Sequence, residues 1–164
     1  MLFRSENEYK GMSVLERLQI LRRIYKFSQK VDFLHSSFVV EKKHIKNETE
    51  LIETLARKIS DTIRENYAYF LSFDKIKVYY DNGQSGVMKI IVTVFTTMFR
   101  NVEFRKAFQR DYKMLQVTDL ICTIALTEQK MRLNTLSRSE RYRLGSDKNI
   151  KKNFLAPLSR KMLQ

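Results

Sequence analysis

Two aspartates stand where carboxylates could do chemistry. Asp81 comes directly after an alternating apolar segment, in VYYDNGQSG, and Asp119 is surrounded by apolar residues in LQVTDLI. Hard cations such as Mg²⁺ and Mn²⁺ prefer oxygen ligands, and they neutralise charge on a reacting phosphate and activate water. Catalysis is therefore one interpretation of each aspartate. The other is local, an Asx turn for Asp81 and a helix N-terminal cap for Asp119, and spacing alone favours it.

The element that follows Asp81 decides between two structures. An Asn-Gly pair between apolar runs is typical of a two-residue hairpin, with VMKIIVTVF as the return strand. The apolar residues of 87–98 instead recur at helical spacing, and strict alternation fails among them. We therefore predict a strand over 75–80 and a helix capped by Ser85. Asp81 would then lie at the tip of a strand, where open α/β sheets hold ligands.

Caps and periodicity predict the other helices. Ser13 with Glu16 forms a capping box, and Asn47 with Glu50 repeats the pattern. The predicted helices are 13–29, 48–71, 117–131 with Thr118 or Asp119 in its first turn, a short helix that Ser137 with Glu140 starts, and a basic, amphipathic tail from Asp147. We expect that tail to dock through Phe154, Leu155 and Leu158, with Pro157 beginning a fresh turn.

Two further strands are predicted. Segment 31–41 lacks helix breakers and is rich in β-branched and aromatic residues, with Leu34, Phe38 and Val40 on one face. Segment 101–108 reads as a charged edge strand. The alternation of helices and strands predicts an α/β layer architecture with some parallel pairing, and 164 residues suit a single domain, 1–164.

The charge favours a polyanionic partner. The chain has 31 Lys and Arg against 18 Asp and Glu, a net charge of +13, and the excess is concentrated in residues 99–164. Such a balance favours nucleic acid through release of phosphate counterions, although solvated helix faces would give the same composition. The candidate contacts are Arg100, Arg105, Lys106, Arg110, Lys113, Lys151 and Lys152, with Arg160 and Lys161 beyond them.

Disulfides, His-based metal sites and membrane spans are not expected. Cys122 is the single cysteine and falls on the apolar stripe of a predicted helix, so we expect a small core residue. His35 and His44 are nine residues apart on different elements. No apolar run approaches the ~18 residues that span a bilayer, and the start MLFRSENEYK lacks the apolar core of a signal peptide. We therefore expect a cytoplasmic protein.

Three segments, in their order and spacing, resemble the second half of the bacterial family catalogued as domain of unknown function 3800. They are VYYDNGQ, NVEFRKAFQRDYKMLQVTDLICT and SERYRLGSDKNIKKNFLAPLSRK. The family is assigned a ribonuclease H-like fold, that of resolvases, integrases and related metal-dependent nucleases. The resemblance implies a three-layer fold of mixed sheet and helices. It also implies that Asp81 and Asp119 belong to an acidic cluster holding Mg²⁺ or Mn²⁺, with Gln116 as a neighbouring polar residue.

The chain departs from that family in one respect. Members usually open with a strand ending in Asp-Glu-Ser-Gly, which supplies the first catalytic acid, and no such motif occurs here. The resemblance therefore implies that the first strands of the sheet are missing. A fragment is the favoured explanation; the others are a homodimer that re-pairs the open edge, and a partner chain that supplies the missing strands. Thr118 also replaces a common Ala.

Three functions follow from these expectations. The first is a nuclease-like domain that hydrolyses phosphodiesters, inactive or weakened because one carboxylate is absent. The second is a non-catalytic module that binds nucleic acid through its basic residues. The third is a protein-interaction module that docks a partner through the open sheet edge and the aromatic residues Tyr79, Tyr80 and Phe104.

Overall fold

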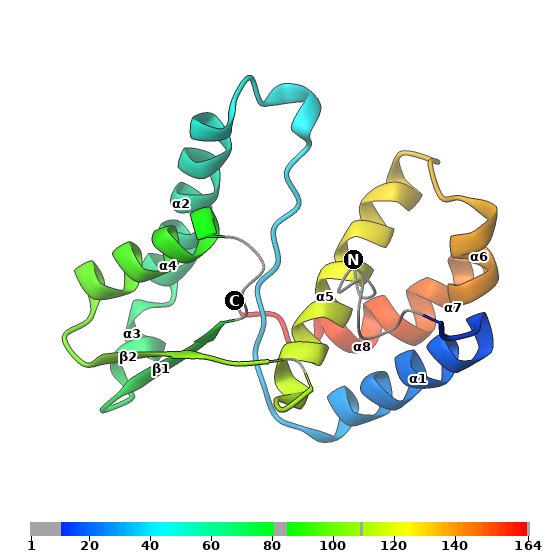
Figure 1. Ribbon diagram of the computed structural model, residues 1–164, viewed down its shortest axis with the longest axis horizontal. Helices are drawn as coiled ribbons and strands as arrows, with labels where there is room; N and C mark the ends of the chain where they lie inside the picture. The colour runs from blue at the N-terminus through cyan, green and yellow to red at the C-terminus, as the bar shows by residue number, and fades with distance from the viewer. Residues whose placement is uncertain (1–10, 81–84, 109, 164) are drawn as a thin grey trace. The chain divides into compact units, whose positions relative to one another are not determined.

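The chain divides into two units of helices, one of which carries a small sheet (Figure 1). The computed structural model describes residues 11–80, 85–108 and 110–163. Within them, unit 1 comprises residues 11–39 and 116–163, and unit 2 comprises residues 40–115. The described residues are mostly helical with a two-stranded parallel sheet, so the expected mixed α/β class is confirmed. None of the described helices is long and apolar enough to cross a membrane.

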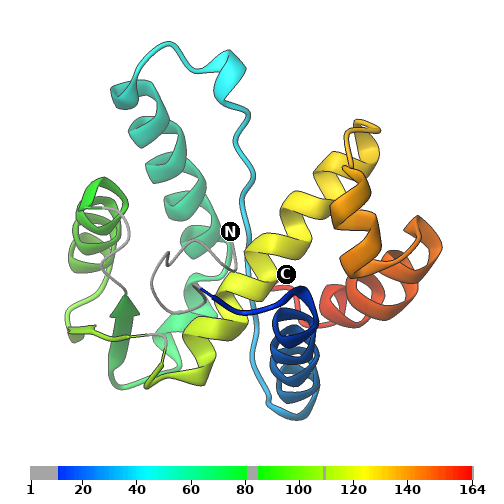
Figure 2. The same cartoon turned by 45° about the vertical axis from the view of Figure 1, so that its right-hand side comes forward.

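Unit 1 is built on α1 (Val14–Lys30) and α5 (Lys113–Arg132), as Figures 1 and 2 show. The predicted capping box starts α1: the Glu16 amide donates to Ser13 Oγ at 3.3 Å, and the Ser13 amide donates to Glu16 Oε2 at 2.6 Å. The core contains Leu21, Ile24, Val117, Leu120, Ile121, Ile124 and Leu158. Both helices therefore bury apolar residues at helical spacing, although Leu15 of α1, on the predicted stripe, is 67% exposed.

Short helical segments follow α5 in the chain and complete unit 1. They are α6 (Arg138–Leu144), α7 (Asp147–Ile150), the π-helical turn η2 (Lys151–Leu155) and α8 (Ala156–Ser159). Leu158 is 4% exposed, and Phe154 and Leu155 pack against the same core, so the predicted docking of the tail is confirmed. Pro157 lies in the first turn of α8, the place that the predicted fresh turn gives it.

Segment 31–41 is not a strand, contrary to prediction. It forms one isolated bridge, in which the His35 amide donates to Lys161 O at 2.8 Å and the Leu163 amide donates to His35 O at 2.8 Å. Burial does alternate, but Leu34 and Phe38 of the predicted inward face are exposed, whereas Phe33 and His35 are half-buried, as is Val40. The period-2 pattern marks an extended chain, and the chain tail supplies the backbone partners of its bridge at His35.

Unit 2 contains the sheet and the helices that accompany it. After the turn η1 (Lys42–His44) come α2 (Glu48–Glu65), α3 (Tyr67–Leu71), β1 (Ile76–Tyr80), α4 (Ser85–Met98) and β2 (Val102–Lys106). The predicted helix over 48–71 is thus interrupted at Asn66, whose side chain donates to Thr62 O at 3.0 Å. The start of α4 adjoins residues outside the described ranges, so the capping role of Ser85 stays a prediction.

Residues 87–98 are helical, which rules out the hairpin and confirms the strand-to-helix alternative. The crossover through α4 allows β2 to run parallel to β1, with Ile76 opposite Val102 and Tyr80 opposite Lys106. Helix α4 packs against α2. The buried residues of unit 2 include Ile63, Ile90 and Phe99, and Phe99 is stacked on Tyr67 with ring centroids 5.6 Å apart.

Candidate nucleic-acid interface

The parallel register places aromatic and basic side chains together where the two strands end. Tyr79 lies opposite Arg105 and Tyr80 lies opposite Lys106. Since successive side chains of a strand point to opposite faces, Tyr79 and Arg105 share one face of the sheet and Lys106 points to the other. Tyr79 and Arg105 are exposed, whereas Tyr80 is half-buried.

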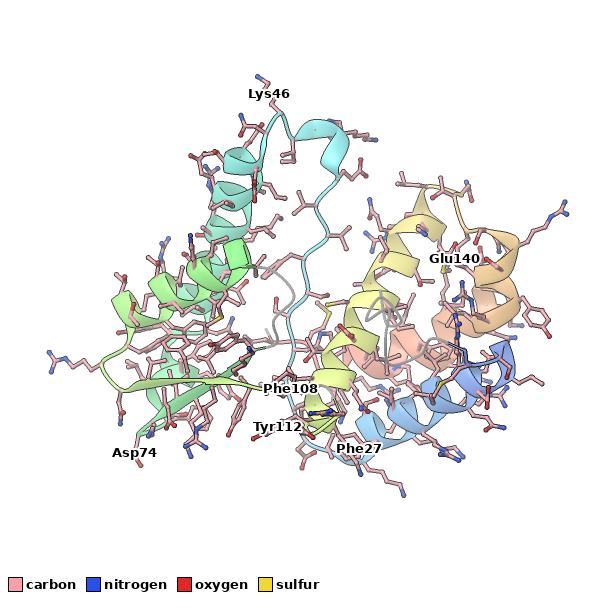
Figure 3. The ribbon with its side chains drawn as sticks, in the orientation of Figure 1. Phe27, Lys46, Asp74, Phe108, Tyr112 and Glu140 are labelled. Carbon is pink, nitrogen blue, oxygen red and sulfur yellow. The ribbon has the colours of Figure 1, made fainter. Side chains whose placement is uncertain are left out.

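A tight turn follows β2 and brings more of these side chains to the same end. The Ala107 amide donates to Tyr80 O at 2.8 Å, and Ala107 is only 2% exposed, which anchors the chain to β1. The carbonyl of Phe108 then accepts hydrogen bonds from the amides of Asp111 and Tyr112 at 3.0 and 3.2 Å. Figure 3 shows Phe108 and Tyr112 beside each other past the end of β2.

Phe108 presents an exposed ring with a cation on either side of it in the sequence. Its side chain is 49% exposed although it is large and apolar. Lys106 Nζ lies 5.8 Å from the ring centroid and Arg110 Cζ lies 5.5 Å from it, both within the range of cation–π attraction. We call Tyr79, Arg105, Lys106, Phe108, Arg110 and Tyr112 the aromatic–basic patch.

A second aromatic pair belongs to the patch. The rings of Tyr79 and Tyr112 have centroids 5.1 Å apart, and the two residues are 38% and 42% exposed. The pair lies on the Arg105 face of the sheet. The patch thus combines two exposed ring systems joined by one short turn, both bordered by positive charge.

The positive charges of the patch are not equally available. Glu103 accepts hydrogen bonds from Lys75, at 2.6 Å, and from Arg105, and these bonds together with their charges hold its pKa at about 2. The Arg105 charge is therefore partly balanced. Arg110 makes only a long ion pair with Asp111, at 3.7 Å, and its side chain is 73% exposed. Lys106 forms no ion pair with any carboxylate that the structure describes.

The other predicted basic contacts belong to other elements of the chain. Arg100 precedes β2 and so lies at the opposite end of that strand, and Lys113 begins α5. Lys151 and Lys152 belong to η2 of unit 1. Lys161 donates to the carbonyls of Ser28 and Val31, at 3.1 and 2.5 Å, and so has a structural role.

The predicted catalytic pair is only partly visible. Asp81 lies outside the described residues. Asp119 and Gln116 are three residues apart on α5 and share a helix face, and both are half-buried. Because α5 begins at Lys113, Asp119 falls in the second turn and is not an N-terminal cap, which corrects that interpretation.

The described residues do not supply a metal site. Among them, no three His, Cys, Asp or Glu side chains are grouped as metal ligands. Asp119 is the one member of the expected acidic cluster whose position is described, and Mg²⁺ or Mn²⁺ held by protein needs several oxygen ligands. We therefore derive no metal-dependent step. The expectation that Cys122 is a small core residue is wrong, because its side chain is exposed on α5.

Sequence reasoning selected the cations of the patch but not its rings. In the sequence, charge indicates Arg105, Lys106 and Arg110, whereas Tyr79 stands out only as an aromatic residue near an open edge. The available signal was the interleaving of rings and cations in FRKAFQRDYK, a composition typical of surfaces that bind single-stranded nucleic acid.

The comparisons with known proteins add no relative. The chain matches no family model, no curated protein and no solved structure. The resemblance noted from its motifs is thus carried by those motifs alone.

Proposed function

We propose that this chain binds polynucleotide through the aromatic–basic patch of unit 2. The observation that carries the proposal is the exposed Phe108 ring between Lys106 and Arg110. An apolar ring held in solvent costs free energy that burial would recover, and the adjacent ammonium and guanidinium groups would attract phosphates. Nucleic acid supplies both partners at once, because each nucleotide carries a flat base and a phosphate.

The charge of the whole chain supports the same class of partner. A net charge of +13 raises the local concentration of any polyanion around the protein. Charge alone would serve an acidic protein as well as a nucleic acid. The exposed rings favour the polynucleotide, since base–aromatic stacking adds to phosphate contacts and tolerates any sequence.

The test is binding of a fluorescein-labelled 20-nucleotide DNA strand, followed by anisotropy at several salt concentrations. The double variant Lys106→Gln/Arg110→Gln should bind roughly tenfold more weakly. The slope of its log affinity against log salt concentration should fall by the amount that corresponds to up to two phosphate contacts. The matched control is Lys46→Gln/Arg57→Gln, which removes the same charge from exposed residues of unit 2 outside the patch. Equal losses in both double variants would show that net charge, and not the patch, holds the strand.

We also propose, as a second candidate, a nuclease-like domain of ribonuclease H-like fold, as the motif resemblance implies, that is inactive or weakened in this chain because one carboxylate is absent. It is favoured by Asp119, a half-buried carboxylate that follows fully buried Val117 and does not cap its helix. With Asp81 it would hold Mg²⁺ or Mn²⁺ weakly, because no Asp-Glu-Ser-Gly motif adds a further acid. Completion of the sheet by a second copy or a partner chain stays a prediction.

The measurement for the second candidate is calorimetric titration with Mn²⁺. Weak binding should be lost in Asp119→Asn and in Asp81→Asn, and retained in the matched exposed control Asp74→Asn. Cleavage of DNA or RNA should be undetectable in the 164-residue chain. Mn²⁺ binding that survives both substitutions, or robust cleavage, would contradict this candidate.

A further inference from the structure

We infer that the aromatic–basic patch takes single-stranded polynucleotide, with an unstacked base lying on the exposed ring of Phe108. This inference rests on the proposed function and narrows its substrate class. A duplex turns its bases inward and offers a protein only phosphates and base edges. An exposed phenyl face can stack on a base only where the strand is open.

The spacing around Phe108 suits a nucleotide whose base is on the ring. Lys106 Nζ and Arg110 Cζ lie 5.8 and 5.5 Å from the ring centroid, so both cations are close to the ring on which the base would stack and can attract the phosphates of that nucleotide. Arg110 is 73% exposed on its side chain, which leaves it free to exchange the ring face for a phosphate. The ring then loses a cation–π contact and gains a base.

The backbone holds the Phe108 ring in place for this role. The residue lies directly after buried Ala107, whose amide is bound to β1, and its own carbonyl accepts two turn hydrogen bonds. A ring on a fixed turn loses little conformational entropy on stacking. The Tyr79–Tyr112 pair, joined to the same turn through the Tyr112 amide, is a second exposed ring surface, on the Arg105 face of the sheet.

The experiment compares a dT20 strand, a 20-base-pair duplex and a 20-unit abasic strand by anisotropy in the same buffer. The native chain should bind dT20 roughly tenfold tighter than the duplex or the abasic strand, since stacking contributes about a factor of ten per base. Phe108→Ala should lose that factor for dT20 only. Phe108→Trp should keep it, and Phe73→Ala, which removes another half-exposed ring of unit 2, should change nothing.

The outcomes separate this inference from the proposed function. Salt-dependent binding that depends on Lys106 and Arg110 but is equal for dT20, duplex and abasic strands would overturn the single-strand inference and leave polynucleotide binding intact. Absence of salt-dependent binding to all three would overturn both. If Phe108→Ala loses its native circular dichroism spectrum, the affinities of the native chain for dT20 and for the abasic strand decide whether bases contribute to binding, because this comparison needs no substitution.

Discussion

Glu140 shows how much one side chain contributes at a helix start in unit 1. Its carboxylate accepts a hydrogen bond from the Ser137 amide at 2.8 Å, and its own amide donates to Ser137 Oγ at 3.3 Å, which completes the predicted capping box of α6. The other carboxylate oxygen lies 2.5 Å from Lys130 Nζ of α5. One residue thus caps α6 and ties it to α5.

The ionisation of Glu140 should make the stability of unit 1 depend on pH. Partial burial acts to raise its pKa, but hydrogen bonds from Lys130 and Ser137 outweigh that effect and hold the pKa at about 2. A carboxylate whose pKa is lowered by folding stabilises the folded state at pH values above its unfolded pKa, near 4.5. This contribution is lost as the pH falls towards 2. Glu140→Gln should therefore lower the free energy of unfolding at pH 7, with a difference that shrinks between about pH 4.5 and pH 2.

Urea denaturation at pH 7, 4 and 2.5 measures this difference. The control Glu53→Gln removes an exposed carboxylate from α2 and should follow the native chain. A Glu140→Gln deficit that stays constant from pH 7 to pH 2.5 would mean that the carboxylate charge does not stabilise the contact.

Local patterns predicted caps better than they predicted burial. Ser13, Asn47 and Ser137 all accept the amide hydrogen bond that their positions indicated. These contacts span three residues, so the sequence contains both partners. Asp119 and Cys122 were assigned wrongly, because the start of α5 and the side of it that is covered depend on residues far away in the chain.

At the scale of elements, periodicity decided more than composition. The β-branched run after Asn-Gly resembled a strand, yet its helical stripe predicted α4 correctly. Segment 31–41 failed for the complementary reason, since alternation and β-branched residues require an extended chain but not a sheet. A strand forms only where a second segment pairs with it, and the residues of the first segment do not reveal whether such a partner exists.

Helix α5 should be the element on which unit 1 depends most. Val117 and Leu120 are fully buried, and Ile124 is 2% exposed. Leu120→Ala should lower the free energy of unfolding by about 3 kcal/mol, because it removes buried methyl groups and leaves a cavity. The control Leu15→Ala, at a residue of α1 that is 67% exposed, should change it by less than about 0.5 kcal/mol.

Chemical denaturation of both variants gives the two free energies. A loss for Leu120→Ala no larger than that for Leu15→Ala would contradict the assignment of α5 to the core.

At the scale of the whole molecule, the tail of the chain stabilises its first helix. Lys161 Nζ donates to the carbonyls of Ser28 and Val31, at the C-terminal end of α1, where a positive charge is favourable. The same group lies 4.6 Å from the centroid of the Phe33 ring. One ammonium therefore satisfies carbonyls more than 120 residues away in sequence.

Lys161→Met should keep the packing of the side-chain stem and lose the ammonium contacts. We expect the free energy of unfolding to fall by about 2 kcal/mol, the range found for hydrogen bonds to charged groups. Lys152→Met, which changes an exposed lysine of η2, is the matched control and should be close to neutral. Thermal denaturation of the pair is the measurement, and equal melting temperatures would show that the contact contributes nothing.

The sequence by itself determined the caps, the helical stripes, the order of helix and strand around Asp81 and the excess of positive charge. Each of these rests on residues within about one or two helical turns of each other or on a sum over the chain. Only the tertiary structure decided that Tyr79 lies beside Tyr112, that Phe108 stays exposed between two cations, and that segment 31–41 pairs with the tail. Those facts depend on strand register and on contacts between distant residues, which local periodicity does not encode.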